Sequence, residues 1–319
     1  MLGREIRPGL PVLAFDRRGE VLCVFRPRQA VAGWRGGPSL VTAWRPATGE
    51  LLARWSADEL NARGRHELVM AISDGAGLIA TTKASDDRAI VLRELATGGV
   101  LARLAGPPDG AVSLAFSPDG RALASGGLDG TVLLWDLTAA WPRRHALRRR
   151  LSEAQWEALW ADLASTDAVR GRSALGALVA APAFTVGRLR GQLRPVPSVK
   201  RRVDALIERL ASDSFTRRQS AERDLAAMGD AVVRHLRAAL AQELDLEQRT
   251  RVLRLLARLK ERPLAGEELR ERRAVEAVET IGTPGAAALL RALAGGDGAA
   301  RLTVEAKLAL GRVERQRKK

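Results

Sequence analysis

The stretch AVSLAFSPDGRALASGGLDGTVLLWDL, residues 111–137, decides the fold of the first half of this chain. Its three short apolar segments, AVSLAF, ALASGG and TVLLWDL, are separated by PDG at 118–120 and by DG at 129–130. Proline at the first position of a turn and an Asp-Gly pair are typical of tight connections between antiparallel strands. The stretch therefore predicts a three-stranded antiparallel sheet.

Weaker copies of this pattern occur twice upstream, in ELVMAISDGAGLIATTKASDDRAIVLRELATGG at 67–99 and in PVLAFDRRGEVLCVF with SLVTAWRPATGE between 11 and 50. Phe116 follows Ile72 by 44 residues, and Trp135 follows Leu92 by 43. A fixed period of this length is the mark of a repeat architecture. The first 141 residues thus predict about three repeated sheets, with Leu92 at the position of Trp135.

Residues 111–137 resemble a blade of a WD-repeat β-propeller, including the Trp135-Asp136 pair of the WD signature. In that family a tryptophan, a strand serine or threonine, a turn aspartate and a Gly-His pair form a buried hydrogen-bond network. The resemblance implies that Trp135, Ser125 and Asp129 take three of these places. The histidine is absent, because the corresponding segment at 105–107 is AGP. We expect these residues to be structural and not catalytic.

The number of blades departs from the family pattern. Propellers close into a ring with four to eight blades, whereas three leave a strand edge and an apolar face uncovered. Two explanations remain. The chain is a fragment of a longer propeller protein, which we favour, or its three blades form an open arc that associates with something else. Self-association through the open edges belongs to the second explanation.

The sequence after Trp141 changes to the periodicity of α-helices. Apolar residues recur at i, i+3, i+4 and i+7 in 156–163, 203–210 and 252–259. We expect about ten helices, most of them 10 to 15 residues long. The expected N-terminal caps are Ser152 with Gln155, Asp213, Asp245, and Thr283 before Pro284.

The helical part also repeats. Residues 163–193 align with 210–240 without a gap and are identical at 12 of 31 positions, and IGTPGAAALLRAL at 281–293 is a partial third copy. A period of about 47 residues with paired helices resembles HEAT-type solenoids. We therefore predict a β + α multidomain chain: a partial propeller of about three blades (1–141), a basic linker (142–150) and a HEAT-like array of helical hairpins (151–319).

From about residue 111 to 313 the chain resembles the C-terminal region of a family of large bacterial WD-repeat proteins, in which a propeller precedes a helical tail. The segments that carry the resemblance are WDL at 135–137, LSEAQWEALWADLAS at 151–165, DSFTRRQSAERDLAAMG at 213–229 and ETIGTPGAAALLRALAGG at 279–296. The resemblance implies an interaction module without an activity of its own.

The net charge of +15 is concentrated in the helical part: residues 1–141 hold 16 basic and 15 acidic side chains, and residues 142–319 hold 36 and 22. Two basic clusters stand out, one of Arg143, Arg144, Arg148, Arg149 and Arg150 and one of Arg315, Arg317, Lys318 and Lys319. Such clusters neutralise phosphates in nucleic-acid-binding proteins. Arginine is much more frequent than lysine along the whole chain, so the arginine-rich clusters reflect the general composition. For this reason we favour a solvated basic surface over a nucleic-acid-binding site.

The sequence predicts no enzyme and no cofactor or metal site. A glycine-rich phosphate loop is missing, and His66-Glu67 is not followed by the second histidine of a zinc-protease helix. His145 lies in a basic run, and we expect all three histidines, His235 included, to be surface or packed residues; Asp86-Asp87 falls in an expected turn. Cys23, the single cysteine, excludes disulfides within the chain. Together with the absence of a signal peptide or an apolar run of membrane-spanning length, these features predict a cytoplasmic protein.

We therefore expect a non-catalytic scaffold that binds other proteins through the propeller arc and the helical solenoid. The alternative is a nucleic-acid-associated regulatory factor that uses the basic helical half. The sequence does not identify the protein partner, and it predicts no membrane association.

Overall fold

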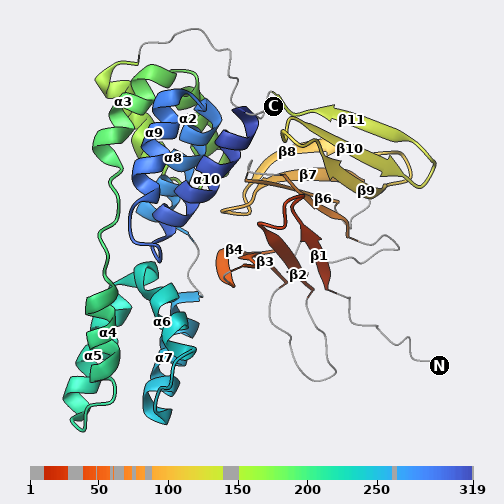
Figure 1. Cartoon of the computed structure of the whole chain (residues 1–319). Helices are drawn as coiled ribbons and strands as arrows, with labels where there is room; N and C mark the ends of the chain where they lie inside the picture. The colour runs from red at the N-terminus through yellow and green to blue at the C-terminus, as the bar shows by residue number, and fades with distance from the viewer. Residues whose placement is uncertain are drawn as a thin grey trace, which may run out of the picture. The chain divides into compact units, whose positions relative to one another are not determined.

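The structure, a computed structural model, describes residues 11–27, 39–47, 49–57, 60, 68–73, 77–82, 88–138, 151–260 and 264–317. These residues form eleven strands and then ten α-helices (Figure 1). They group into two compact units. The first contains the described residues up to 138 together with 152–180 and 264–270, and the second contains 151, 181–260 and 271–317.

The strands form three antiparallel sheets in the first unit. Sheet 1 has the order β1-β2-β3-β4, sheet 2 the order β5-β6-β7-β8, and sheet 3 the order β9-β10-β11. The strands are β1 (Val12–Phe15), β2 (Leu22–Arg26), β3 (Leu40–Arg45), β4 (Glu50–Ser56), β5 (Met70–Ile72), β6 (Leu78–Thr82), β7 (Ala89–Glu94), β8 (Val100–Ala105), β9 (Ala111–Phe116), β10 (Ala122–Gly127) and β11 (Val132–Asp136). Each sheet is a meander, as the turn chemistry of the sequence predicts.

Equivalent positions in the three sheets follow from the hydrogen bond that closes the first turn of each. In every sheet, the residue after the first strand donates its N–H to a carbonyl at the start of the second strand, either that of its first residue or that of the residue just before it. The pairs are Asp16 with Val21, Ser73 with Leu78, and Ser117 with Ala122. Phe15, Ile72 and Phe116, which precede the donors, are therefore equivalent to one another.

Two apolar cores hold the three sheets together in chain order. One core joins Cys23, Phe25 and Val41 of sheet 1 to Met70 and Ile72 of sheet 2. The other joins sheet 2 to sheet 3, with Leu78, Ile90 and Leu92 against Leu123 and the partly buried Trp135. Each sheet thus packs face to face on the next, as the blades of a propeller do.

The first unit also contains α1 (Glu153–Asp162) and α2 (Ala168–Val179). A capping box formed by Ser152 and Gln155 begins α1, as predicted. The indoles of Trp156 and Trp160 stack with their ring centroids 5.5 Å apart, and Arg270 lies over Trp160 at 5.2 Å. Arg270 Nε also donates to the Trp160 carbonyl oxygen over 3.1 Å, so a residue late in the chain covers α1.

The second unit is entirely helical in its described part. Its helices are α3 (Pro182–Gln192), α4 (Lys200–Arg209), α5 (Phe215–Ala227), α6 (Val233–Leu240), α7 (Leu246–Lys260), α9 (Pro284–Ala294) and α10 (Arg301–Arg317), together with most of α8 (Glu267–Ile281). Helices α4 to α7 share one core, in which Val203, Leu210, Leu225, Leu236 and Val252 are fully or almost fully buried. The predicted apolar stripes of α4 and α7 therefore face this core.

The expected helix caps are found with one exception. Asp245 Oδ1 accepts from Gln248 N over 2.7 Å before α7, and Thr283 caps α9 with Pro284 in its first turn. The exception is α5, whose N-cap is Ser214 and not Asp213. The 47-residue spacing recurs in the structure, since α2 begins at Ala168 and α5 at Phe215. The predicted fold class, a partial propeller followed by an all-helical part, is confirmed.

Candidate interaction surfaces

Sheet 3 contains the pair of residues that the WD resemblance places at the centre of a blade. Trp135 on β11 donates its indole N–H to Ser125 Oγ on β10 over 3.1 Å. Ser125 is buried, and Trp135 is partly buried and packs against the core between sheets 2 and 3. The structure therefore brings these two residues together, although ten positions separate them in the sequence.

Two aspartates of the same blade are exposed next to β11, Asp129 in the turn before the strand and Asp136 at its end. Asp129 Oδ1 accepts from the backbone N–H of Thr131 over 2.9 Å and from its hydroxyl over 2.7 Å. The side-chain hydrogen bond from Thr131, assisted by the backbone one, lowers the pKa of Asp129 below its ordinary value. Asp136 Oδ1 accepts from Thr138 N over 2.8 Å. These contacts stabilise the turns on either side of β11.

The residue equivalent to Trp135 in sheet 2 is Arg93, not Leu92 as the spacing predicted. Strand pairing aligns Trp135 with Leu123 and Phe116, and it aligns Arg93 with Ile79 and Ile72. The loops differ in length between the two repeats, so counting residues misses the register by one. In sheet 1 the equivalent residue is Trp44, which pairs with Leu22.

Arg93 takes the place of the tryptophan by stacking on another one. Its guanidinium carbon lies 5.6 Å from the centroid of Trp55, which belongs to β4 of sheet 1. Arg93 Nη1 also donates to the Gly98 carbonyl oxygen over 3.0 Å. A cation over an indole contributes more when it is desolvated, and Arg93 is buried.

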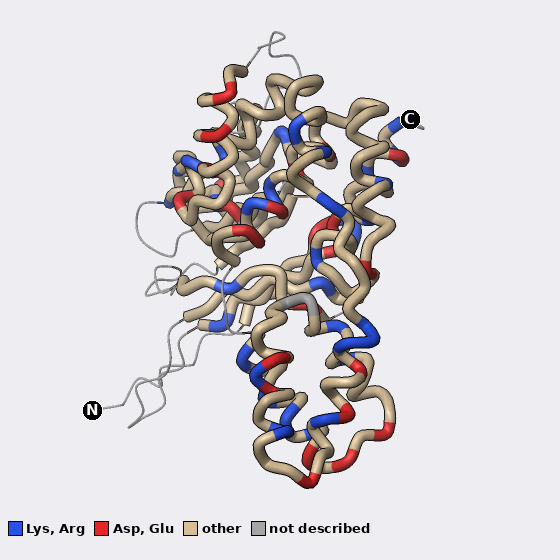
Figure 2. Tube along the Cα trace, turned by 90° about the vertical axis from the view of Figure 1, so that its left-hand side faces the viewer, with Lys and Arg blue, Asp and Glu red and all other residues tan. Residues whose placement is uncertain are grey.

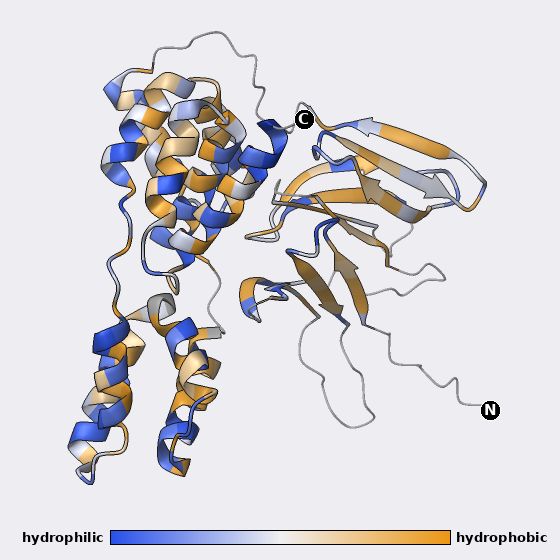
Figure 3. Ribbon diagram, in the orientation of Figure 1, coloured by the Kyte–Doolittle hydropathy of each residue, from blue (hydrophilic) through white to orange (hydrophobic). Residues whose placement is uncertain are grey.

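The outer side of sheet 3 is apolar and exposed. Val132 and Leu134 on β11 are 70% and 77% exposed, and Leu128 in the preceding turn is 62% exposed. Across the sheet, Leu134 pairs with Ala124, which pairs with Ala115, so small residues complete this side. Figure 3 shows β11 as hydrophobic over most of its length. In the described part of the chain no strand pairs with the outer edge of β11.

Sheet 1 presents a second apolar face at the other end of the arc. Leu13 and Phe15 on β1 are 62% and 58% exposed. They pair with Val24 and Leu22, and Trp44 lies on the same face one strand further on. Strand β1 is likewise hydrophobic in Figure 3. The sequence indicated an uncovered face, but only the strand register identifies the residues on it.

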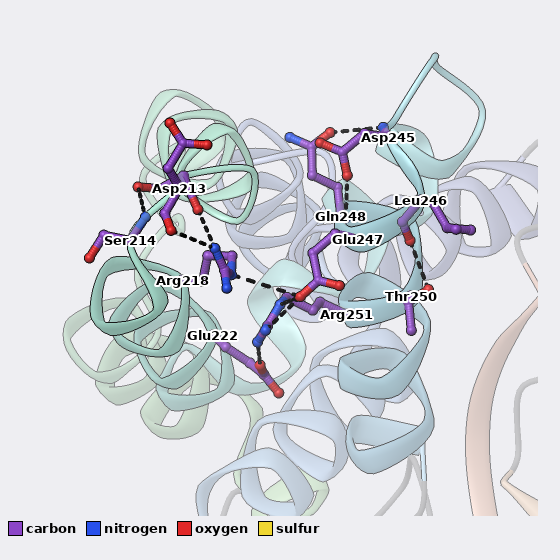
Figure 4. A network of polar contacts seen from close by, with 11 residues as sticks. Asp213, Ser214, Arg218, Glu222, Asp245, Leu246, Glu247, Gln248, Thr250 and Arg251 are labelled. Atoms are coloured by element: carbon purple, nitrogen blue, oxygen red, sulfur yellow. Dashed lines mark hydrogen bonds and ion pairs between the residues drawn. The ribbon is translucent and has the colours of Figure 1, made fainter.

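Ion pairs join several basic side chains of the helices to acidic ones. Figure 2 shows Lys and Arg intermingled with Asp and Glu along the helices. In the network of Figure 4, Arg251 on α7 contacts Glu222 on α5 over 2.7 Å and Glu247 over 2.6 Å. Arg312 on α10 forms two hydrogen bonds with Glu279 on α8, of 2.6 and 2.8 Å.

The predicted cluster Arg143, Arg144, Arg148, Arg149 and Arg150 lies outside the described residues, as do Lys318 and Lys319. Arg315 and Arg317 are on the last turns of α10, where Arg317 Nη2 donates to the Gly282 carbonyl oxygen over 2.9 Å. One of the terminal arginines thus has a contact within the helical unit.

His235 is the one histidine of the chain that the structure describes, since His66 and His145 fall outside the described ranges. Its Nε2 lies 3.3 Å from Asp297 Oδ2. The Asp86-Asp87 pair is also outside the described residues. Among the described side chains, no three or more His, Cys, Asp or Glu residues gather as a metal site would require. No helix of the described part combines the length and apolar character needed to cross a membrane.

A comparison with known protein families gives a match that falls on the blade described above. The family described as WD domain, G-beta repeat, matches residues 98–136, which run from the turn before β8 to the end of β11. The match therefore covers the outer strand of sheet 2 and all of sheet 3. No curated protein matches the chain.

Proposed function

We propose that this chain is a non-catalytic scaffold that binds other proteins. The observation that carries the proposal is the WD repeat at residues 98–136, whose sheet 3 leaves Leu128, Val132 and Leu134 exposed. Large apolar side chains that gather on one surface are typical of interaction sites. WD repeats commonly mediate protein interactions, which agrees with this surface.

The finer parts of the proposal rest on the sequence. We propose that residues 1–141 form the propeller arc, that 142–150 link it to the helices, and that 151–319 act as a HEAT-like solenoid. The 47-residue repeat supports the solenoid. The resemblance to the tails of large bacterial WD-repeat proteins supports a bacterial origin, and the lone Cys23 agrees with a cytoplasmic location. Within sheet 3, we propose Trp135, Ser125, Asp129 and Asp136 as a structural network and not as a catalytic one.

A photo-crosslinking experiment tests the scaffold function directly. A photoreactive amino acid replaces Leu128, which is exposed in the turn between β10 and β11, in cells that produce the full chain. The control replaces Leu246, which is 82% exposed at the start of α7. The proposal predicts discrete adducts with other proteins at position 128 that are missing or different at position 246. Adducts with the same proteins at both positions, or with none, would contradict it.

A further inference from the structure

The interface between sheets 2 and 3 shows which residues pack together when one sheet of the arc covers the next. We call the side of a sheet that faces the next sheet in chain order its forward face, and the opposite side its rear face. The forward face of sheet 2 contributes Leu78, Ala80, Ile90 and Leu92 to the shared core. The rear face of sheet 3 contributes Leu114, Phe116, Leu123 and Trp135.

The forward face of sheet 3 carries the same kind of residues at the same register positions. Strand pairing makes Ala122, Ala124, Val132 and Leu134 equivalent to the four forward-face residues of sheet 2. All four are apolar, and Val132 and Leu134 are among the most exposed large apolar residues of the described chain. This surface is built as a forward face, but in the described residues no further sheet covers it.

The rear face of sheet 1 is the matching half. Its residues at the positions of Leu114, Phe116, Leu123 and Trp135 are Leu13, Phe15, Leu22 and Trp44. These residues are again apolar, and Trp44 is a tryptophan at the same position as Trp135. One chain therefore carries both halves of an interface that it already uses internally, with one half at each end of its arc.

The described residues form three sheets. Two copies of such an arc would supply six blades, which lies within the four to eight of known propellers, whereas three copies would supply nine. An interface that joins unlike faces closes into a ring when the rotation between copies matches. Closure would also remove from water the exposed apolar residues at both ends of the arc.

We propose that two copies of this chain associate head to tail into a six-bladed ring. The forward face of sheet 3 in each copy packs on the rear face of sheet 1 in the other, with Leu134 and Val132 against Phe15 and Leu13. The proposal deepens the scaffold function, on which it rests, by naming a second copy of the chain as one partner. Blades of any other polypeptide are the competing occupant of these faces.

The molar mass of the full chain in solution tests the ring. Light scattering coupled to size-exclusion chromatography should give twice the 34.4 kDa of one chain across a concentration series. Leu134→Asp and Phe15→Asp should each give a monomer with unchanged circular dichroism, because both side chains are exposed in the isolated arc. Leu246→Asp, on the exposed surface of α7, is the matched control and should remain dimeric. A monomeric unsubstituted chain would overturn the proposal.

Cross-linking distinguishes a head-to-tail ring from other dimers. Leu134→Cys and Phe15→Cys are prepared as separate proteins and treated with a short bismaleimide, with the buried Cys23 left in place. The ring predicts a covalent dimer only when the two variants are mixed. Cross-linking of Leu134→Cys to itself would indicate a dimer of like faces and contradict the ring. Neither result alters the test at Leu128, which detects other proteins, so the failure of the ring and the failure of the scaffold are separate outcomes.

Discussion

Trp135 contributes to sheet 3 through two interactions that mutation can separate. Its ring packs against the core shared with sheet 2, and its indole N–H donates to the buried Ser125 hydroxyl. Trp135→Phe keeps most of the packing and should lower the free energy of unfolding by about 1 kcal/mol through the lost hydrogen bond. Trp135→Ala also leaves a cavity and should cost about 2–4 kcal/mol. Urea unfolding followed by circular dichroism measures both, and equal losses for the two variants would contradict this division.

Gly98 and Gly130 have similar backbone conformations but different surroundings, so substitutions at the two positions separate backbone strain from steric clash. Both have a positive φ, of +72° and +80°. A Cβ at Gly98 would lie 2.3 Å from Cδ2 of Trp55, whereas a Cβ at Gly130 would meet nothing within 4 Å. Gly130→Ala should therefore lower the free energy of unfolding by about 1 kcal/mol, because its only cost is the left-handed backbone conformation. Gly98→Ala should lower the free energy of unfolding by about 1–3 kcal/mol more than Gly130→Ala, since the indole that stacks on Arg93 must shift.

Thermal unfolding of the two glycine variants gives the comparison. A melting temperature for Gly98→Ala no lower than that of Gly130→Ala would mean that Trp55 is free to move. It would also weaken the role assigned to the contact between Arg93 and Trp55.

At the scale of elements, Asp297 ties the connection between α9 and α10 to the start of α4. Its carboxylate accepts from Val199 N over 2.8 Å and from Ala299 N over 2.8 Å, and it lies 3.3 Å from His235 Nε2. Burial alone would raise the pKa of Asp297. The backbone N–H groups of Ala299 and Val199, with the imidazole of His235, outweigh this effect and hold the pKa below the ordinary 3.8.

A lowered pKa in the folded state predicts how stability depends on pH. The carboxylate of Asp297 contributes its full stabilisation above its ordinary pKa and loses it as the pH falls through the lowered value. The unsubstituted chain should thus exceed Asp297→Asn in unfolding free energy by about 1–2 kcal/mol at pH 6, and this advantage should shrink below about pH 4. Urea titrations of both proteins at several pH values measure the difference. A difference that stays constant down to pH 3 would contradict the assignment.

Periodicity and turn chemistry were sufficient to predict most elements. The alternation and the PDG and DG turns identified β9 to β11, and the i, i+3, i+4 pattern located α4 and α7. The sequence did not predict that Arg93 replaces Trp135, because strand register depends on loop length and cross-strand pairing. It also did not predict that α1 and α2 group with the sheets, because that arrangement depends on contacts such as Arg270 on Trp160.

For the whole molecule, the excess of positive charge predicts weak binding to DNA without sequence preference. Residues 142–319 carry 36 basic against 22 acidic side chains, and several of the arginines are already paired with glutamates. Fluorescence anisotropy should show an affinity for duplex DNA that falls steeply with salt, with a slope of about 0.9 for each phosphate contact. Unrelated DNA should compete equally. Preference for one sequence at physiological salt would instead favour the regulatory alternative.

Serine substitution of the predicted basic cluster refines this test. A variant that replaces Arg143, Arg144, Arg148, Arg149 and Arg150 should have a smaller salt slope if these residues contact phosphates. An unchanged slope would place the contacts on the helices, where Figure 2 shows basic and acidic residues intermingled.

The position of Arg270 late in the chain determines when its contacts can form during synthesis on the ribosome. Ala96 in the first unit packs with Leu264 and Leu269, and Arg270 covers Trp160. These partners emerge only after the residues of α3 to α7 have been synthesised. Contacts between residues so distant in sequence form slowly, because a long loop must close first. The nascent first unit thus lacks these contacts while most of the second unit is synthesised. During this interval Ala96 and Trp160 remain uncovered, so a chaperone would find the most apolar surface to bind at this stage.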